Sequence, residues 1–299
     1  MALRFEGTYT ALVTPFLDDA AQSIDWDAFD ALLEKQVAGG VAGVVPCGTT
    51  GESPTLSHEE HGLVVQRTVE RVRGRVQVVA GAGSNSTREA IAISQHAERA
   101  GADAVMVVVP YYNRPTQEGL YRHFVAVARS VRLPVVVYNI PARTGIDLAP
   151  ETLARIAEAA PNVVATKEAT GNVLRAQKIA QSMGHRMTVL SGDDALTLAM
   201  IAVGARGVIS VTSNALPAEV ARATRLALDG AVEQAREAHF ALLPVHEAMF
   251  VEASPAPIKA ALAMRGVGTG VVRSPLAPCT EATRKLLASV LEGQAKGRG

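Results

Sequence analysis

Short runs of apolar and β-branched residues recur along the chain, about one in every thirty residues, and predict buried strands. These runs are nearly continuous in hydrophobicity and do not alternate with polar residues, which is typical of a parallel sheet covered on both faces. Eight runs precede residue 211, at 9–13, 43–46, 76–80, 104–109, 135–138, 163–167, 188–191 and 207–210.

The segments between these runs have the apolar spacing of amphipathic helices, for example at 25–38, 57–72, 87–100, 117–131 and 150–160. Ser57 followed three residues later by Glu60 forms the pattern of a capping box, which predicts a helix start. Eight alternations of strand and helix favour an α/β fold of the (β/α)8 TIM barrel type. A doubly wound parallel sheet is the alternative.

After Pro217 the strand pattern ends, and only helical patterns follow, at 218–229, 231–249, 256–264 and 280–293. We interpret the first as the last barrel helix and the others as a C-terminal helical extension. The sequence thus predicts a barrel domain at 1–229 that carries the active site, and a helical domain at 230–299.

Charge and composition narrow the classes of function. Lys plus Arg and Asp plus Glu each number 29 among 299 residues, so no basic excess is present to bind nucleic acid or an anionic membrane. Cys47 and Cys279 form no C-x-x-C pair, which argues against a disulfide framework and a structural zinc site, and favours the reducing cytoplasm. Residues 1–16 hold no long apolar run, so we expect neither a signal peptide nor a membrane anchor.

In a barrel, the chemistry belongs at the carboxyl ends of the strands. Lys167 closes the sixth run, where burial would lower the pKa of its ammonium into the range of an amine nucleophile, the group that forms Schiff bases. The alternative is a lysine that extends to solvent and pairs with Glu168. The other five lysines fall in helical or tail segments, and we expect no rival among them.

Two other strand ends carry candidate binding groups. The second run leads into Thr49 and Thr50 between glycines, where hydroxyls and backbone N–H groups can face a carboxylate; an ordinary turn and helix cap is the alternative. The fifth run ends at Tyr138 and is followed by Arg143, whose planar guanidinium can hold a carboxylate through two hydrogen bonds or pair with an acid at the rim.

Other ligands are disfavoured at the remaining strand ends. The third run ends in Gly81-Ala82-Gly83 without the third glycine of a dinucleotide site. Asp193 and Asp194 follow the seventh run and would repel a phosphate. No histidine ends a strand, so we expect no metal site.

Five ordered motifs together resemble the dihydrodipicolinate synthase family of pyruvate-dependent class I aldolases, which also includes N-acetylneuraminate lyase. They are GTTGES at 48–53, PYYNRP at 110–115, YNIP with RTG at 138–145, TKE at 166–168 and SGDD at 191–194. The resemblance implies a lyase of lysine and diaminopimelate biosynthesis, in which Lys167 forms an imine with pyruvate and the derived enamine adds to L-aspartate 4-semialdehyde. It implies no cofactor beyond this covalent Schiff base.

The same resemblance assigns roles to individual residues. Tyr138, Thr50 and Tyr112 match a hydroxyl relay that moves protons, with Tyr112 reaching a neighbouring subunit of a homotetramer, a dimer of dimers. The substrate-binding positions are Thr49, Thr50, Arg143, Gly192 and Ile209. A lysine feedback site at the dimer interface matches Ser53, His58, His61, Asn85, Glu89 and Tyr111, although Pro54 stands where lysine-sensitive members often carry a small residue such as alanine.

Two alternatives stay open at this point. A sister aldolase acting on another 2-oxo acid would share Lys167, Tyr138 and Thr50, and Arg143 is the residue that favours the synthase branch. A noncatalytic sensor of pyruvate or lysine is the second alternative, which the retained lysine and hydroxyls disfavour.

Overall fold

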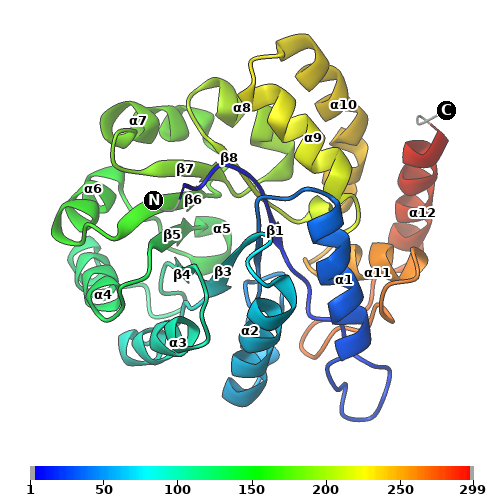
Figure 1. The fold of residues 1–299 in the computed structure, drawn as a ribbon, viewed down its shortest axis with the longest axis horizontal. Helices are drawn as coiled ribbons and strands as arrows, with labels where there is room; N and C mark the ends of the chain where they lie inside the picture. The colour runs from blue at the N-terminus through cyan, green and yellow to red at the C-terminus, as the bar shows by residue number, and fades with distance from the viewer. Residues whose placement is uncertain (1–3, 297–299) are drawn as a thin grey trace.

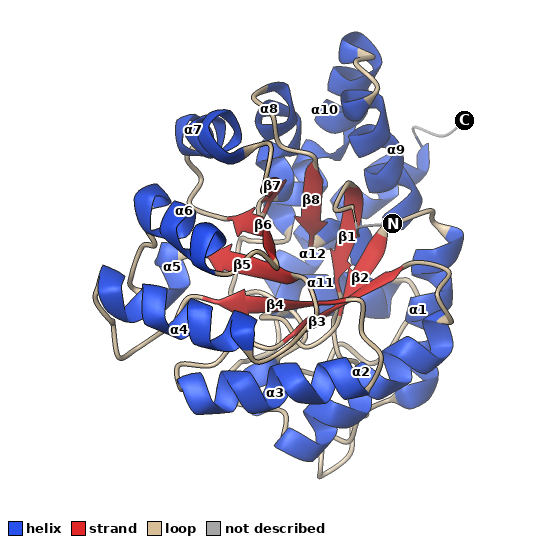
Figure 2. Cartoon of the chain, turned by 60° about the vertical axis from the view of Figure 1, so that its left-hand side comes forward, coloured by secondary structure: helices blue, strands red, loops and turns tan. Residues whose placement is uncertain are grey.

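The computed structural model describes residues 4–296, and within them eight parallel strands close into a barrel in sequence order. This confirms the predicted (β/α)8 barrel and excludes the doubly wound sheet. Figures 1 and 2 show the strands at the centre and the helices around them. The strands are β1 (Gly7–Ala11), β2 (Gly43–Val45), β3 (Gln77–Gly81), β4 (Ala104–Val108), β5 (Val135–Asn139), β6 (Val163–Glu168), β7 (Thr188–Ser191) and β8 (Gly207–Ser210).

The barrel helices follow the strands as the apolar spacing predicts, and α2 begins with the expected capping box of Ser57 and Glu60. Short 3₁₀ turns lie at Ser53–Thr55 (η1), Asp194–Leu196 (η2) and Thr212–Asn214 (η3). The helices are α1 (Trp26–Ala38), α2 (His58–Val72), α3 (Thr87–Arg99), α4 (Gln117–Arg129), α5 (Pro141–Thr144), α6 (Pro150–Ala159), α7 (Val173–Met183), α8 (Thr197–Ala202) and α9 (Pro217–Leu228).

The first strand was predicted at 9–13 but spans Gly7–Ala11. Gly7 pairs with Gly207 where β8 closes the barrel, and a Cβ on Gly207 would lie 2.0 Å from the carbonyl oxygen of Gly7. Only a glycine at position 207 allows this approach, and the apolar pattern carries no sign of it. At the other end, the N–H of Val13 donates to the Asn214 side chain at 3.1 Å and not to a strand.

Apolar side chains fill the inside of the barrel, so a substrate can bind only at its rim. The inner cluster contains Tyr9, Val45, Met106, Leu190 and Ile209, all buried. A larger cluster lies between the strands and the surrounding helices. Because a packed interior is no pore, a substrate reaches the site from the carboxyl ends of the strands.

Three helices follow the barrel, α10 (Val232–Ala248), α11 (Ala256–Met264) and α12 (Glu281–Lys296). Helix α10 packs against α9, and α12 packs against α10 and α11 (Figure 1). The division into domains at 229/230 stays a prediction. Within residues 4–296, none of the helices combines the length and the apolar character that crossing a membrane requires.

Candidate active site

Lys167 lies where the barrel brings β5 and β6 together. The parallel register places Lys167 opposite Tyr138, and the lysine Nζ lies 4.2 Å from the centroid of the tyrosine ring. Only 5% of Lys167 is exposed. Burial lowers the pKa of Lys167 to about 8, opposed by the negative charge of Asp194 and assisted by the positive charge of Arg143.

This pKa predicts how covalent reactivity depends on pH. Only the neutral amine attacks a carbonyl, so a pKa of about 8 makes the reactive fraction rise with pH through that value and level off above it. We expect kcat/KM for pyruvate, which reports groups of the free enzyme, to follow the same curve. Initial rates measured from about pH 6.5 to 9.5 test this, because a flat profile contradicts a titrating amine.

Tyr138 is buried beside Lys167, and burial raises the pKa of its phenol to about 12, against the lowering effects of Arg143 and of a side-chain hydrogen bond with Thr49. The sequence-based relay named Thr50, but the hydroxyl that contacts Tyr138 belongs to Thr49. Thr49 and Tyr138 line the cavity above the barrel, whereas Thr50 and Lys167 are not among the described residues that line it; Lys167 lies behind the ring of Tyr138, which it contacts. The two threonines are adjacent, and the backbone of the turn decides which one faces the site.

The cavity above the barrel has a volume of about 220 Å³ and is lined by residues including Thr49, Tyr138 and Arg143. Arg143 comes from the short helix α5 and is exposed, and its Nη2 lies 3.5 Å from the carbonyl oxygen of Ser254. Its guanidinium is therefore available to a carboxylate at the cavity entrance.

Gly192 and Ile209, the two remaining substrate-binding candidates, lie at the end of β7 and within β8. A Cβ on Gly192 would lie 2.5 Å from the Cβ of Ala169, so this backbone packs directly on the chain that follows Lys167. Ile209 belongs to the inner cluster together with Tyr138. Asp194, buried nearby, accepts hydrogen bonds from the N–H groups of Val211 and Thr212 at 2.8 and 3.2 Å.

Tyr112, the member of the relay that the resemblance assigns to the site of a neighbouring subunit, is exposed in its own chain. It is 89% exposed and adopts a left-handed backbone with φ of 68°. Its neighbour Tyr111 is partly buried and lines the cavity. In a single chain the structure therefore brings together Tyr138 and Thr49, and it leaves the side chain of Tyr112 exposed on the surface.

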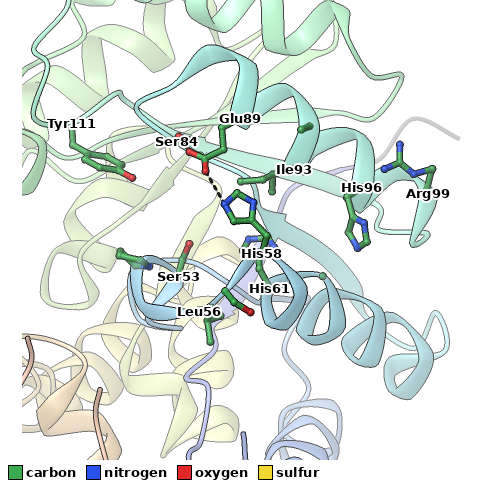
Figure 3. A pocket seen from close by; sticks show the side chains of 15 residues that line it. Ser53, Leu56, His58, His61, Ser84, Glu89, Ile93, His96, Arg99 and Tyr111 are labelled. Atoms are coloured by element: carbon green, nitrogen blue, oxygen red, sulfur yellow. Dashed lines mark hydrogen bonds and ion pairs between the residues drawn. The ribbon is translucent and has the colours of Figure 1, made fainter. Parts of the chain in front are cut away.

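A second cavity of about 390 Å³ is shown in Figure 3. It adjoins the first, because Ser53, Pro54, Gly83 and Tyr111 line both. Six residues were predicted for a lysine site, and all of them except Asn85 are among the described residues that line this cavity. The five that line it are Ser53, His58, His61, Glu89 and Tyr111.

Two polar contacts on the wall of this second cavity hold the carboxylate of Glu89 in position. It pairs with Nε2 of His58 at 3.0 Å and accepts a hydrogen bond from Ser84 (Figure 3). Nε2 of His61 is hydrogen-bonded to the carbonyl oxygen of Gly81 at 2.9 Å, and burial lowers the pKa of this imidazole, which keeps it neutral. A ligand with an ammonium group would find its partner in Glu89.

Sequence reasoning missed a second buried lysine. Lys259 lies in α11, as the helical pattern predicts, but only 3% of it is exposed and burial lowers its pKa to about 8, as for Lys167. The prediction that the other lysines lie in helical segments holds for Lys259, but nothing in the apolar pattern indicated its burial or its lowered pKa. The two differ in position, because the Nζ of Lys259 is paired with Glu52 and that of Lys167 lies against a cavity-lining phenol.

Within residues 4–296, His, Cys, Asp and Glu side chains form no group of three or more that could hold a metal ion. Cys47 and Cys279 are both buried and free.

Comparison with known proteins identifies relatives over the whole chain. The model of the dihydrodipicolinate synthetase family matches residues 4–294. The 4-hydroxy-tetrahydrodipicolinate synthase of Sorangium cellulosum is 57% identical over 289 residues, 97% of this chain and 96% of that protein. The solved structure of the enzyme of that name from Methylacidiphilum fumariolicum is 45% identical, with a TM-score of 0.95 over 98% of this chain and 97% of the other.

Two further solved structures contain ligands. The chloride-inhibited dihydrodipicolinate synthase of Acinetobacter baumannii, complexed with pyruvate, is 40% identical with a TM-score of 0.94, covering 97% of this chain and 99% of that one. The enzyme from Cyanidioschyzon merolae with lysine bound is 38% identical with a TM-score of 0.93, covering 97% and 98%.

Proposed function

The chain belongs to the dihydrodipicolinate synthetase family and is a lyase with 4-hydroxy-tetrahydrodipicolinate synthase activity in the lysine and diaminopimelate pathway, and we propose that it acts through a Schiff base on Lys167. Its substrates are then pyruvate and L-aspartate 4-semialdehyde. The observation that carries the proposed mechanism is the buried amine of Lys167, with a pKa of about 8, against the phenol of Tyr138 at the mouth of the barrel.

In the proposed reaction the neutral amine of Lys167 adds to the ketone carbon of pyruvate, and the adduct loses water to form an imine. The protonated imine nitrogen accepts electron density when the methyl carbon loses a proton, which gives an enamine. The enamine carbon then attacks the aldehyde carbon of the semialdehyde. The amino group of that substrate finally attacks the imine carbon, which closes the ring and releases Lys167.

Proton transfers in this sequence need a group that both donates and accepts. The phenol of Tyr138 lies beside Lys167 and shares a hydrogen bond with Thr49, so we assign the relay to Tyr138 and Thr49. Thr50 stays a prediction of the family resemblance. Backbone N–H groups of the turn at 48–50 would hold the pyruvate carboxylate, and Arg143 the carboxylate of the semialdehyde.

The choice of aldehyde is tested with wild-type protein, pyruvate and a panel of aldehydes. We expect the highest kcat/KM with L-aspartate 4-semialdehyde, because Arg143 at the cavity entrance suits a carboxylate. Faster turnover of a sugar aldehyde would instead identify a sister aldolase. Binding of pyruvate without turnover of any aldehyde would identify a sensor. A chelator is expected to leave the rate unchanged, since the proposed route uses no metal.

We further propose that the enzyme works in the cytoplasm as a homotetramer, a dimer of dimers, in which Tyr112 completes the relay of a neighbouring subunit. Its exposure of 89% and left-handed backbone support this proposal, because a phenol so exposed is free to enter the site of a second copy. Sedimentation velocity of the purified protein measures the oligomeric state.

The second cavity is proposed as a lysine feedback site, with Glu89 as the partner of the ligand's side-chain or α-ammonium group. We expect Glu89→Gln to raise the inhibition constant for lysine at least about tenfold, since a charge-assisted bond is lost. Inhibition assays with L-lysine measure this, and Glu98→Gln, on the same helix, is the control. Equal inhibition of Glu89→Gln and wild type would place lysine elsewhere or show no site at all.

A further inference from the structure

Glu52 closes the turn that carries Thr49, and its backbone adopts a conformation that is unfavourable in free energy for a residue with a Cβ. Its φ of 54° lies in the left-handed region, which a residue with a Cβ enters only when its surroundings hold it there. The N–H of Glu52 donates to the carbonyl oxygen of Thr49 at 3.1 Å. The position of Glu52 therefore sets the position of the Thr49 peptide.

Two groups from beyond the barrel anchor the carboxylate of Glu52, which is 1% exposed. One oxygen accepts from Nζ of Lys259 in α11 at 2.5 Å, and the other accepts from the backbone N–H of Arg273 at 2.9 Å. A buried carboxylate without partners is costly, so the turn and the C-terminal extension hold each other in one arrangement.

The anchoring groups are themselves fixed around Phe16, which follows β1. Nζ of Lys259 lies 3.9 Å and Cζ of Arg273 lies 4.2 Å from the centroid of this ring. The guanidinium of Arg273 also donates hydrogen bonds to both carboxylate oxygens of Glu60, at 2.6 and 2.8 Å. Glu60 lies near the start of α2. The turn is thus tied on one side to the extension and continues on the other into a helix held by the same arginine.

We propose that Lys259 is a positioning residue of the reaction: together with the backbone N–H of Arg273 it holds Glu52, and through Glu52 it keeps Thr49 against Tyr138 and the turn N–H groups in place for the pyruvate carboxylate. This inference rests on the proposed function. The C-terminal extension is then part of the active-site framework, although its residues do not touch the substrate. A small displacement of the turn would weaken binding of pyruvate and leave the Arg143 side of the cavity in place.

The test compares full-length Lys259→Met, the double variant Glu52→Gln/Lys259→Met and the control Asp30→Asn. Asp30 is also buried and paired, with Arg67 at 2.5 Å and Arg71 at 3.1 Å, but it joins α1 to α2 outside the barrel. For each protein we would measure the melting temperature, kcat, KM for pyruvate and for the semialdehyde, and the yield of borohydride-trapped pyruvate adduct.

We expect Lys259→Met to raise KM for pyruvate about tenfold and to change KM for the semialdehyde by less than about twofold. The double variant should regain thermal stability, because no unpaired charge is buried, and keep the raised KM, because the neutral amide that replaces the Glu52 carboxylate has lost one of two anchors. Asp30→Asn should lose stability and keep both KM values. If Lys259→Met does not fold, the double variant carries the comparison.

Wild-type KM for pyruvate in the double variant would overturn the inference, since the pair would then act through stability alone. A fall in kcat with unchanged KM in Lys259→Met would do the same, because it reports a smaller folded fraction. Failure of the proposed function itself is recognised separately, by the absence of a borohydride-trapped adduct in the wild-type protein.

Discussion

Replacing Lys167 with alanine is expected to abolish turnover and leave the barrel folded. The substitution removes the only atom proposed to bond to the substrate, so we expect kcat to fall on the order of 10⁴-fold or more. The fold should survive because Lys167 is a buried amine whose charge the interior already disfavours, as its pKa of about 8 indicates. Assays of initial rate and circular dichroism of the same sample measure the two effects.

Borohydride reduction in the presence of pyruvate, followed by peptide mapping, shows which amine reacts. Mapping matters here because Lys259 has the same lowered pKa of about 8 and is also buried. We expect the adduct on Lys167 in the wild type and in Lys259→Met at saturating pyruvate, and no adduct in Lys167→Ala. An adduct on Lys259, or retained activity in Lys167→Ala, would falsify the proposed mechanism.

Tyr138→Phe is expected to lower kcat about 10²-fold and to change KM for pyruvate little, because the phenol takes part in proton transfer and general acid–base groups contribute on this scale. The ring that contacts Lys167 is kept, so the burial of the amine is preserved. Steady-state kinetics measure the effect. A loss of less than about threefold would show that another group moves the protons.

Tyr9→Phe is the matched control for this variant. Tyr9 is a buried tyrosine of the same barrel, and its hydroxyl donates to Oε1 of Gln77 at 2.6 Å at the opposite, amino-terminal end of the strands. Tyr9→Phe removes a partly buried side-chain hydrogen bond that lies away from the site. We expect Tyr9→Phe to lose some stability and to keep kcat within about twofold.

Local patterns were sufficient to predict much of the site. The eight apolar runs predicted the barrel, and a lysine at the end of one run was enough to place Lys167 at the mouth of a buried core, where burial lowers its pKa. The segment with Tyr138 and Arg143 lies beside Lys167 for the same reason, since parallel strands all end at one rim. The Thr49 and Thr50 turn was also located, but not which hydroxyl faces the phenol.

What the chain alone determined is therefore periodic or local: strands, helices, the capping box, and the residue types that end each strand. The tertiary structure decided three matters: the contact of Thr49 with Tyr138, the separation of Tyr112 from both, and the pairing of Glu52 with Lys259 across 207 positions. Such contacts depend on the backbone angles of single turns and on how distant segments pack, and neither leaves a repeating signal in the order of residues.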